Sequence, residues 1–165
     1  MAIPDPNWPR WIVASVSDYF KDVSDDIELP LLVEGIDERE AEKIRAMNHF
    51  ELRIHGPETK EVSKAYFRIY VEINLLVTSF IGGEKQNAHE MVQFLGLLQQ
   101  AASEDIPVYR FGLTLGVDDE SFLGCLKPDS ARNEAVTVFN FGEIDRERHI
   151  RQSAVDGRYR MELTV

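Results

Sequence analysis

The sequence has little cysteine, little positive charge and no long hydrophobic run. Its single cysteine, Cys125, excludes an intrachain disulfide. Small secreted domains usually carry several paired cysteines, so we expect a reducing compartment. The most apolar window, residues 69–81, is interrupted by Glu72 and Asn74 and does not predict a transmembrane helix. Residues 1–7 lack both a basic region and an apolar run and therefore do not predict a signal peptide.

The scarcity of positive charge bears on the kind of partner. With 18 Lys and Arg against 29 Asp and Glu, the formal net charge is -11. Phosphate neutralisation needs clustered cations, so this balance argues against a general nucleic-acid binder. The charge is also uneven along the chain. Residues 18–45 hold ten acidic and four basic side chains, whereas residues 146–160 hold five arginines and two acidic side chains.

Length and apolar content predict one folded domain. The 165 residues suffice for one core, and a hydrophobic share of 44% offsets the entropy lost when the chain is ordered. We expect a single domain over 1–165, with an N-terminal arm at 1–7 and a charged surface insertion at 35–48.

Two segments have the spacing of amphipathic helices. Apolar side chains recur at helical intervals in residues 9–23 and again in residues 87–103. Pro9 falls in the first turn of the first helix, where a missing N–H is tolerated. Residues 37–46 contain good helix formers with few apolar anchors, which indicates a short surface helix or a loop.

The longest periodic segment predicts a strand. From residue 65 to residue 78 the odd positions are apolar and the even positions largely polar, as expected of a strand with one face in the core. Such a strand spans about 45 Å, so we expect part of it to project or to pair outside its own sheet. A Gly56-Pro57 turn is expected to end a strand at 50–55, and Asp156-Gly157 to lead into the last strand. The other strands that we expect are 27–34, 107–111, 121–126, 136–144 and 158–165.

Together these elements predict an α+β fold. It would consist of a mixed or mainly antiparallel sheet with two main amphipathic helices packed on it.

The catalytic motifs that the sequence suggests fail on spacing or context. Residues 112–116 (GLTLG) have the outline of a nucleophile elbow, but no periodic helix follows. Residues 118–120 are acidic yet lack the spacing of a calcium loop, and residues 82–85 lack that of a phosphate loop. Cys125 lies in an apolar context, which favours a buried small residue over a nucleophile.

The four histidines do not predict a metal site either. His49 and His55, six positions apart near one strand, would be separated by about 20 Å, and His89 and His149 lie in other elements. The sequence therefore predicts a protein that is not an enzyme and has neither cofactor nor metal.

The arginine-rich segment 146–160 is open to three interpretations. It contacts nucleic acid, it contacts the acidic N-terminal surface of a neighbouring copy, or it is a solvated hairpin. The second would be a heterologous contact, which closes into a ring when the rotation permits. We favour it over nucleic-acid binding, because few aromatic residues are interleaved and the chain is acidic. The candidate interface residues are Arg146, Arg148, Arg151, Arg158 and Arg160 on one side, and Asp25, Asp26, Asp37 and Glu38 on the other.

The order of these elements resembles a family of virion proteins. The aromatic helix PNWPRWIVASVSDYF, the strands LPLLVEG, FELRIHGP and KAYFRIYVEINLLV, a helix, and the closing FNFGEIDRERHIRQSAVDGRYRMEL together resemble tailed-bacteriophage neck and tail-terminator proteins. The resemblance covers most of the chain and includes no catalytic motif.

The resemblance implies a non-enzymatic structural role. It implies an α+β fold and a hexameric ring between connector and tail-tube proteins, assembled in the host cytoplasm into the virion, with transient proximity to DNA and no membrane contact. The charged segment near residues 37–45 departs from the pattern as an extra decoration. Another connector, tube or sheath-initiator role, or an adaptor that binds nucleic acid through the arginine-rich hairpin, therefore remains the alternative.

Overall fold

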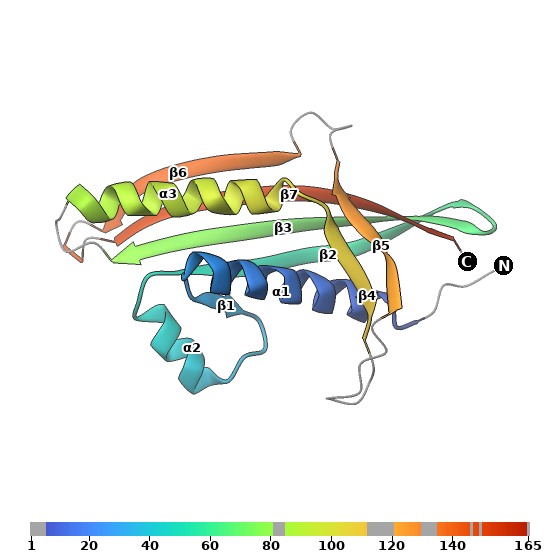
Figure 1. The fold of residues 1–165 in the computed structure, drawn as a ribbon, viewed down its shortest axis with the longest axis horizontal. Helices are drawn as coiled ribbons and strands as arrows, with labels where there is room; N and C mark the ends of the chain where they lie inside the picture. Colours follow the sequence, from blue (N-terminus) through green and yellow to red (C-terminus); the bar gives the residue numbers. More distant parts are fainter. Residues whose placement is uncertain are drawn as a thin grey trace.

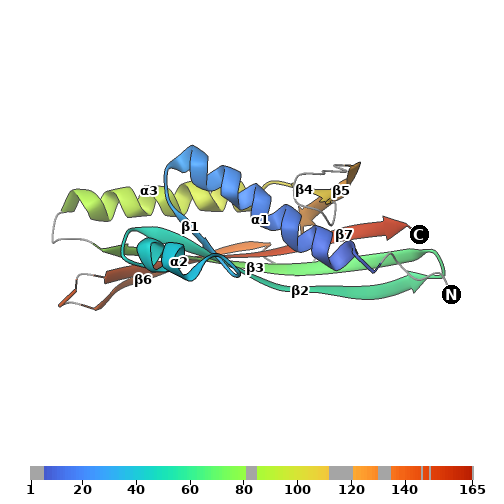
Figure 2. The ribbon, with the colours of Figure 1, turned by 90° about the horizontal axis from the view of Figure 1, so that it is seen from below.

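The fold is mixed α/β, with two long helices on one face of a sheet (Figures 1 and 2). The computed structural model describes residues 6–80, 85–111, 121–129, 135–145, 147–148 and 150–164. In chain order the elements are α1 (Trp8–Ile27), β1 (Leu31–Val33), α2 (Glu38–Arg45), β2 (His49–Ser63), β3 (Tyr66–Phe80), α3 (Lys85–Ala102), β4 (Ile106–Arg110), β5 (Ser121–Pro128), β6 (Val136–Asp145) and β7 (Ile150–Thr164).

The sheet is mixed, as expected. Its strand order is β1-β2-β3-β7-β5-β4, with β6 also paired to β7. Among the described strands only β1 and β2 run parallel, and the other pairs are antiparallel. The prediction of two main helices is roughly matched, since the structure has a third, short helix, α2, besides the two long helices α1 and α3.

Strand β3 organises the sheet, and its predicted alternation is confirmed. The odd-numbered side chains from Phe67 to Val77 are buried, whereas the even-numbered ones are mostly half-exposed. The expectation that β3 pairs outside its own sheet was wrong, because it pairs along its length with β2 on one side and β7 on the other. The β2–β3 hairpin nevertheless extends beyond the helices (Figures 1 and 2).

Helix α1 runs one turn beyond its predicted end. The apolar spacing predicted a helix over 9–23, but the helix continues to Ile27 and closes at Glu28, which has a left-handed φ of 58°. Ser24 is buried and its hydroxyl donates to the carbonyl of Leu29 at 2.5 Å, so this residue supports the C-terminus from inside the helix.

The C-terminus of α3 is held by two tyrosines. The last carbonyls of a helix have no partner within it. Tyr19 of α1 donates its hydroxyl proton to the Ala101 carbonyl at 2.7 Å, and Tyr159 of β7 donates to the Ala102 carbonyl. Burial raises the pKa of Tyr159. These bonds fasten α1, α3 and the sheet together at one point.

Strand β7 is longer than predicted because Asp156-Gly157 lies inside it. The dipeptide was expected to lead into a strand at 158, yet β7 begins at Ile150 and pairs with β3 throughout. A Cβ atom on Gly157 would lie 2.7 Å from the ring of Tyr159. The glycine therefore serves the packing of that ring and makes no turn.

Strand β2 also runs through an expected turn. Gly56 has a φ of 99°, and the register with β3 shifts between His55 and Glu58, which marks a β-bulge. The strand then continues to Ser63, because β3 offers backbone partners beyond the bulge.

We expect Gly157→Ala to lower the free energy of unfolding by about 1–3 kcal/mol, since the new methyl group collides with the Tyr159 ring. Chemical denaturation measures this change. The matched control is Gly96→Ala in α3, where a Cβ meets nothing within 4 Å. That substitution should raise stability by about 0.5–1 kcal/mol. Equal effects of the two variants would contradict the packing described for Tyr159.

Candidate functional site

The face of the sheet opposite α1 and α3 is the largest continuous feature that remains for function. We call it the open face. It is formed by the even-numbered residues of β3 and by the residues paired with them on β2, β7 and β6. Helices α1 and α3 both lie on the other side (Figure 2), and α2 lies at the β1 margin.

Charged side chains on the open face pair across the strands. Arg158 of β7 contacts Glu72 of β3 at 3.4 Å, and Arg68 of β3 contacts Glu162 of β7 at 3.6 Å. Each of these ion pairs joins residues directly opposite in the ladder. Exposed pairs of this kind contribute little stability, so their main effect is a locally neutral surface.

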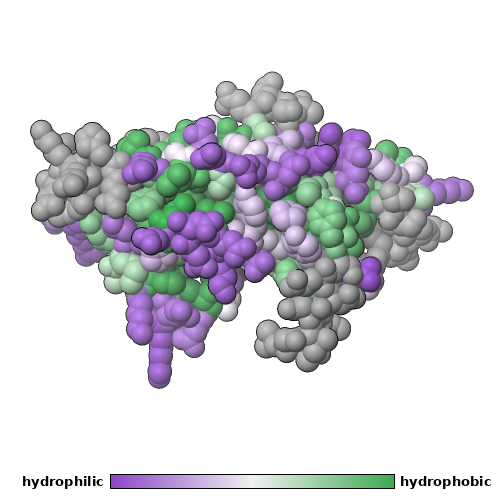
Figure 3. Space-filling view, in the orientation of Figure 1, coloured by the Kyte–Doolittle hydropathy of each residue, from purple (hydrophilic) through white to green (hydrophobic). Residues whose placement is uncertain are grey.

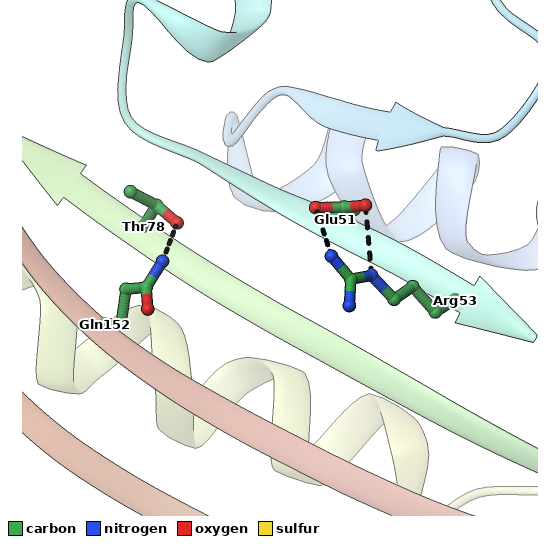
Figure 4. A network of polar contacts seen from close by, with 4 residues as sticks. All are labelled: Glu51, Arg53, Thr78 and Gln152. Carbon is green, nitrogen blue, oxygen red and sulfur yellow. Dashed lines mark hydrogen bonds and ion pairs between the residues drawn. The ribbon is translucent and has the colours of Figure 1, made fainter.

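Neutral polar groups and one further ion pair continue this pattern. Gln152 donates to the Thr78 hydroxyl at 3.5 Å, and Arg53 donates to Glu51 at 3.1 and 3.5 Å (Figure 4). Asn74 donates to the carboxylate of Asp156. The central part of the open face is therefore polar and largely self-compensated.

At the hairpin end of the open face a tyrosine changes the titration of a carboxylate. The Tyr66 hydroxyl donates to Glu162, and this bond, with the charges of Arg68 and Arg160, lowers the pKa of the Glu162 carboxyl below its usual value. The same bond raises the pKa of Tyr66. A lowered pKa favours an ionised partner for cations and is the opposite of what a general acid requires.

Near the β6 edge the open face becomes apolar. Phe139 and Phe141 are 42% and 57% exposed, and their rings stack with centroids 6.3 Å apart. Phe139 stands opposite Ala154, which stands opposite Leu76. We did not single out these phenylalanines from the sequence, although the alternation FNF within an expected strand is the signal that places both rings on one face.

Neither the protein-family models nor the curated proteins compared with this chain give a match.

The candidate arginines lie in two places. Arg148, in the β6–β7 turn, and Arg151, at the start of β7, are exposed, and Arg148 contacts Asp145 at 3.9 Å. We call these two residues the arginine turn. Arg158 and Arg160 lie farther along β7 on the open face, about 20 Å or more from Arg151 at 3.3 Å per residue. Arg146 lies outside the described residues.

The candidate acidic residues lie together at the other edge of the sheet. Asp25 and Asp26 are exposed in the last turn of α1, and Glu38 is exposed in α2. Asp37 is the N-cap of α2 and accepts a hydrogen bond from the Arg39 N–H at 2.9 Å. We call the C-terminal half of α1 together with α2 the acidic lobe. Figure 3 shows hydrophilic surface over both.

A groove of about 790 Å³ separates α1 from α2 within the acidic lobe. Asp18, Asp25 and Glu40 line it together with Lys21 and Lys43. Its apolar lining comes from Ala14, Leu31, Val33, Ile36, Ile44, Met47 and Phe111.

The described histidines and Cys125 are not brought together into one site. His49 and His55 both lie on β2, and the His49 Nδ1–H is bonded to the Met47 carbonyl at 2.8 Å. Cys125 is half-buried in β5 rather than fully buried. Within the part of the chain that the structure describes, no group of His, Cys, Asp or Glu could hold a metal ion, and no helix is long and apolar enough to cross a membrane. Residues 112–116, 118–120, 82–84 and His149 lie outside it, as do residues 1–5 of the expected arm.

We expect Tyr66→Phe to raise the pKa of Glu162, because it removes the hydroxyl whose hydrogen bond lowers that pKa most. The side-chain carboxyl chemical shift of Glu162 followed by NMR across an acid titration measures this change. With a lowered pKa, the Glu162 contribution to stability is present above its usual pKa and is lost as pH falls through the lowered value. Tyr109→Phe in β4 is the control, since Tyr109 is not among the groups that shift Glu162. An unchanged titration in Tyr66→Phe would exclude the hydrogen bond.

Proposed function

We propose that the chain is a non-enzymatic virion structural protein of a tailed phage that forms a ring at the head-proximal end of the tail, as a hexamer like that of the family it resembles. Its neighbours in that role are connector and tail-tube proteins. The acidic lobe and the arginine turn carry this proposal, because they flank the same end of the sheet, the lobe on the β1 side and the turn on the β6 side. Exposed guanidinium groups on one side of the sheet and exposed carboxylates on the other favour head-to-tail contact between copies, which closes into a ring when the rotation permits.

The local chemistry of the two surfaces supports the same contact. Asp25 and Asp26 lie at the C-terminus of α1, which has no basic residue in its last turn. The helix dipole there disfavours anions by about 0.3–1 kcal/mol each. An arginine supplied by a neighbour would offset that cost.

Shape and polarity also match. The groove of the acidic lobe combines three acidic and two basic side chains with an apolar lining. Near the arginine turn, Ile144 at the end of β6 has an exposed side chain. A cation and an apolar group presented together suit a groove of that composition.

Charge reversal at the arginine turn tests the proposal. We expect Arg148→Glu with Arg151→Glu to weaken self-association about tenfold or more, because both groups would then face the carboxylates of the next copy. Light scattering during size-exclusion chromatography at low salt measures the assembly, and negative-stain images show whether it is a ring.

Two further variants make this test specific. Lys60→Glu with Lys64→Glu changes the net charge equally at the β2–β3 hairpin and should leave assembly intact. Adding Asp25→Arg and Asp26→Arg to the arginine-turn variant should restore association. A wild-type chain that stays monomeric at high concentration and in the presence of its neighbours would contradict the proposal. DNA affinity that falls steeply with salt and depends on Arg148 would favour the adaptor role instead.

A further inference from the structure

Within the described part of the chain, the outer edge of β6 lacks the usual protection over its first half. Strand β6 pairs with β7, and no described strand pairs with its other side (Figure 1). Edge strands are normally blunted by charges, proline or bulges. Residues 135–142 (AVTVFNFG) contain neither charge nor proline, and the first register shift comes only after Asn140.

The backbone groups on this edge point outward at alternate residues. Arg158 donates its backbone N–H to the Ala135 carbonyl, so Ala135 faces β7. In an antiparallel ladder the bonding direction alternates, so Thr137 and Phe139 also bond to β7. Val136, Val138 and Asn140 therefore direct their N–H and C=O groups toward the free edge. Such a row is a template for another strand.

We propose that this edge pairs with the same edge of a second copy, antiparallel about a two-fold axis at Val138. In that register Val138 meets Val138, and Val136 meets Asn140. Thr137 meets Phe139 on the open face, a pairing of a β-branched with an aromatic side chain that stabilises sheets. Phe141 then lies opposite Ala135 of the other copy.

Register and charge favour a second copy as the occupant. When the contact is centred on Val138, each outward-pointing residue of one copy faces an outward-pointing residue of the other. The paired segment ends before the bulge and Glu143. No like charges meet within the paired residues. It also covers the side of Phe139 and Phe141 that faces the edge, which accounts for two exposed stacked rings on a largely polar surface.

The helices leave room for this contact. A two-fold axis perpendicular to the sheet puts both helical layers on the same side. Since α3 lies over β7 and β6 (Figure 1), the two α3 helices would stand roughly 10–14 Å apart, at or beyond the usual packing distance of about 8–10 Å. The contact is smaller than a standard interface of roughly 800 Å² per partner, so we expect a concentration-dependent dimer.

A cysteine trap tests the axis directly. In a Cys125→Ala background, Val138→Cys places two thiols on the axis, where opposite Cα atoms of a hydrogen-bonded pair are about 5.5 Å apart, within the range for a disulfide. We expect this variant to form a covalent dimer under mild oxidation about tenfold faster than Val62→Cys, whose position on β2 is 53% exposed but away from the edge. Equal rates would overturn the proposal.

Sedimentation velocity over a concentration series gives an independent measurement. Val138→Pro removes an outward N–H without removing a bond to β7, and Phe139→Lys places like charges near the axis. Both should weaken the dimer about tenfold or more, whereas Phe122→Lys, at a 60% exposed phenylalanine on β5, should not. Circular dichroism confirms that each variant is folded. A wild-type chain that sediments as a monomer throughout, with no enhanced cross-link at position 138, would refute the edge contact.

The edge contact and the ring contact can be tested independently. Reversal of Arg148 and Arg151 should leave the cross-link at position 138 unchanged, because the arginine turn lies at the other end of β6. Loss of the cross-link in that variant would show that the two contacts are one.

Discussion

The antiparallel pairing of β3 with β2 and β7 is the interaction on which the rest of this structure depends. All fifteen residues of β3 pair with β7 and twelve of them also pair with β2, so the strand is long and central. Its strict alternation puts one set of side chains under α1 and α3 and leaves the other set on the open face. The acidic lobe, the arginine turn and the β6 edge all lie at margins of the sheet that β3 organises.

Helix placement follows from the same constraint. The buried face of β3 is a continuous row from Phe67 to Val77, and amphipathic helices are needed to cover it. Tyr19 and Tyr159 then fix α1, α3 and β7 through adjacent carbonyls at the end of α3. Since both long helices lie on one side, the other side has mainly polar side chains and paired charges, with an apolar part at Leu76, Ala154 and the phenylalanines of β6.

Two strands show how long-range pairing overrides local signals. Gly56-Pro57 and Asp156-Gly157 both have the composition of turns, and both lie within strands that pair with β3. At Gly56-Pro57, a β-bulge accommodates the positive φ of the glycine. At the second, the glycine gives space to the Tyr159 ring. Neither outcome can be read from a dipeptide, because it depends on residues distant in sequence.

The sequence by itself determined which segments are helices and strands and which face of β3 is buried, since periodicity of 3.6 or 2 records burial directly. It also determined the separation of acidic and arginine-rich segments. Only the tertiary structure decided that the arginines divide between the β6–β7 turn and the open face, that the acidic lobe lies at the opposite edge, and that Phe139 and Phe141 are exposed. The physical reason is that strand order and register are set by backbone pairing between distant segments, and those pairings, more than local composition, bring side chains together or hold them apart.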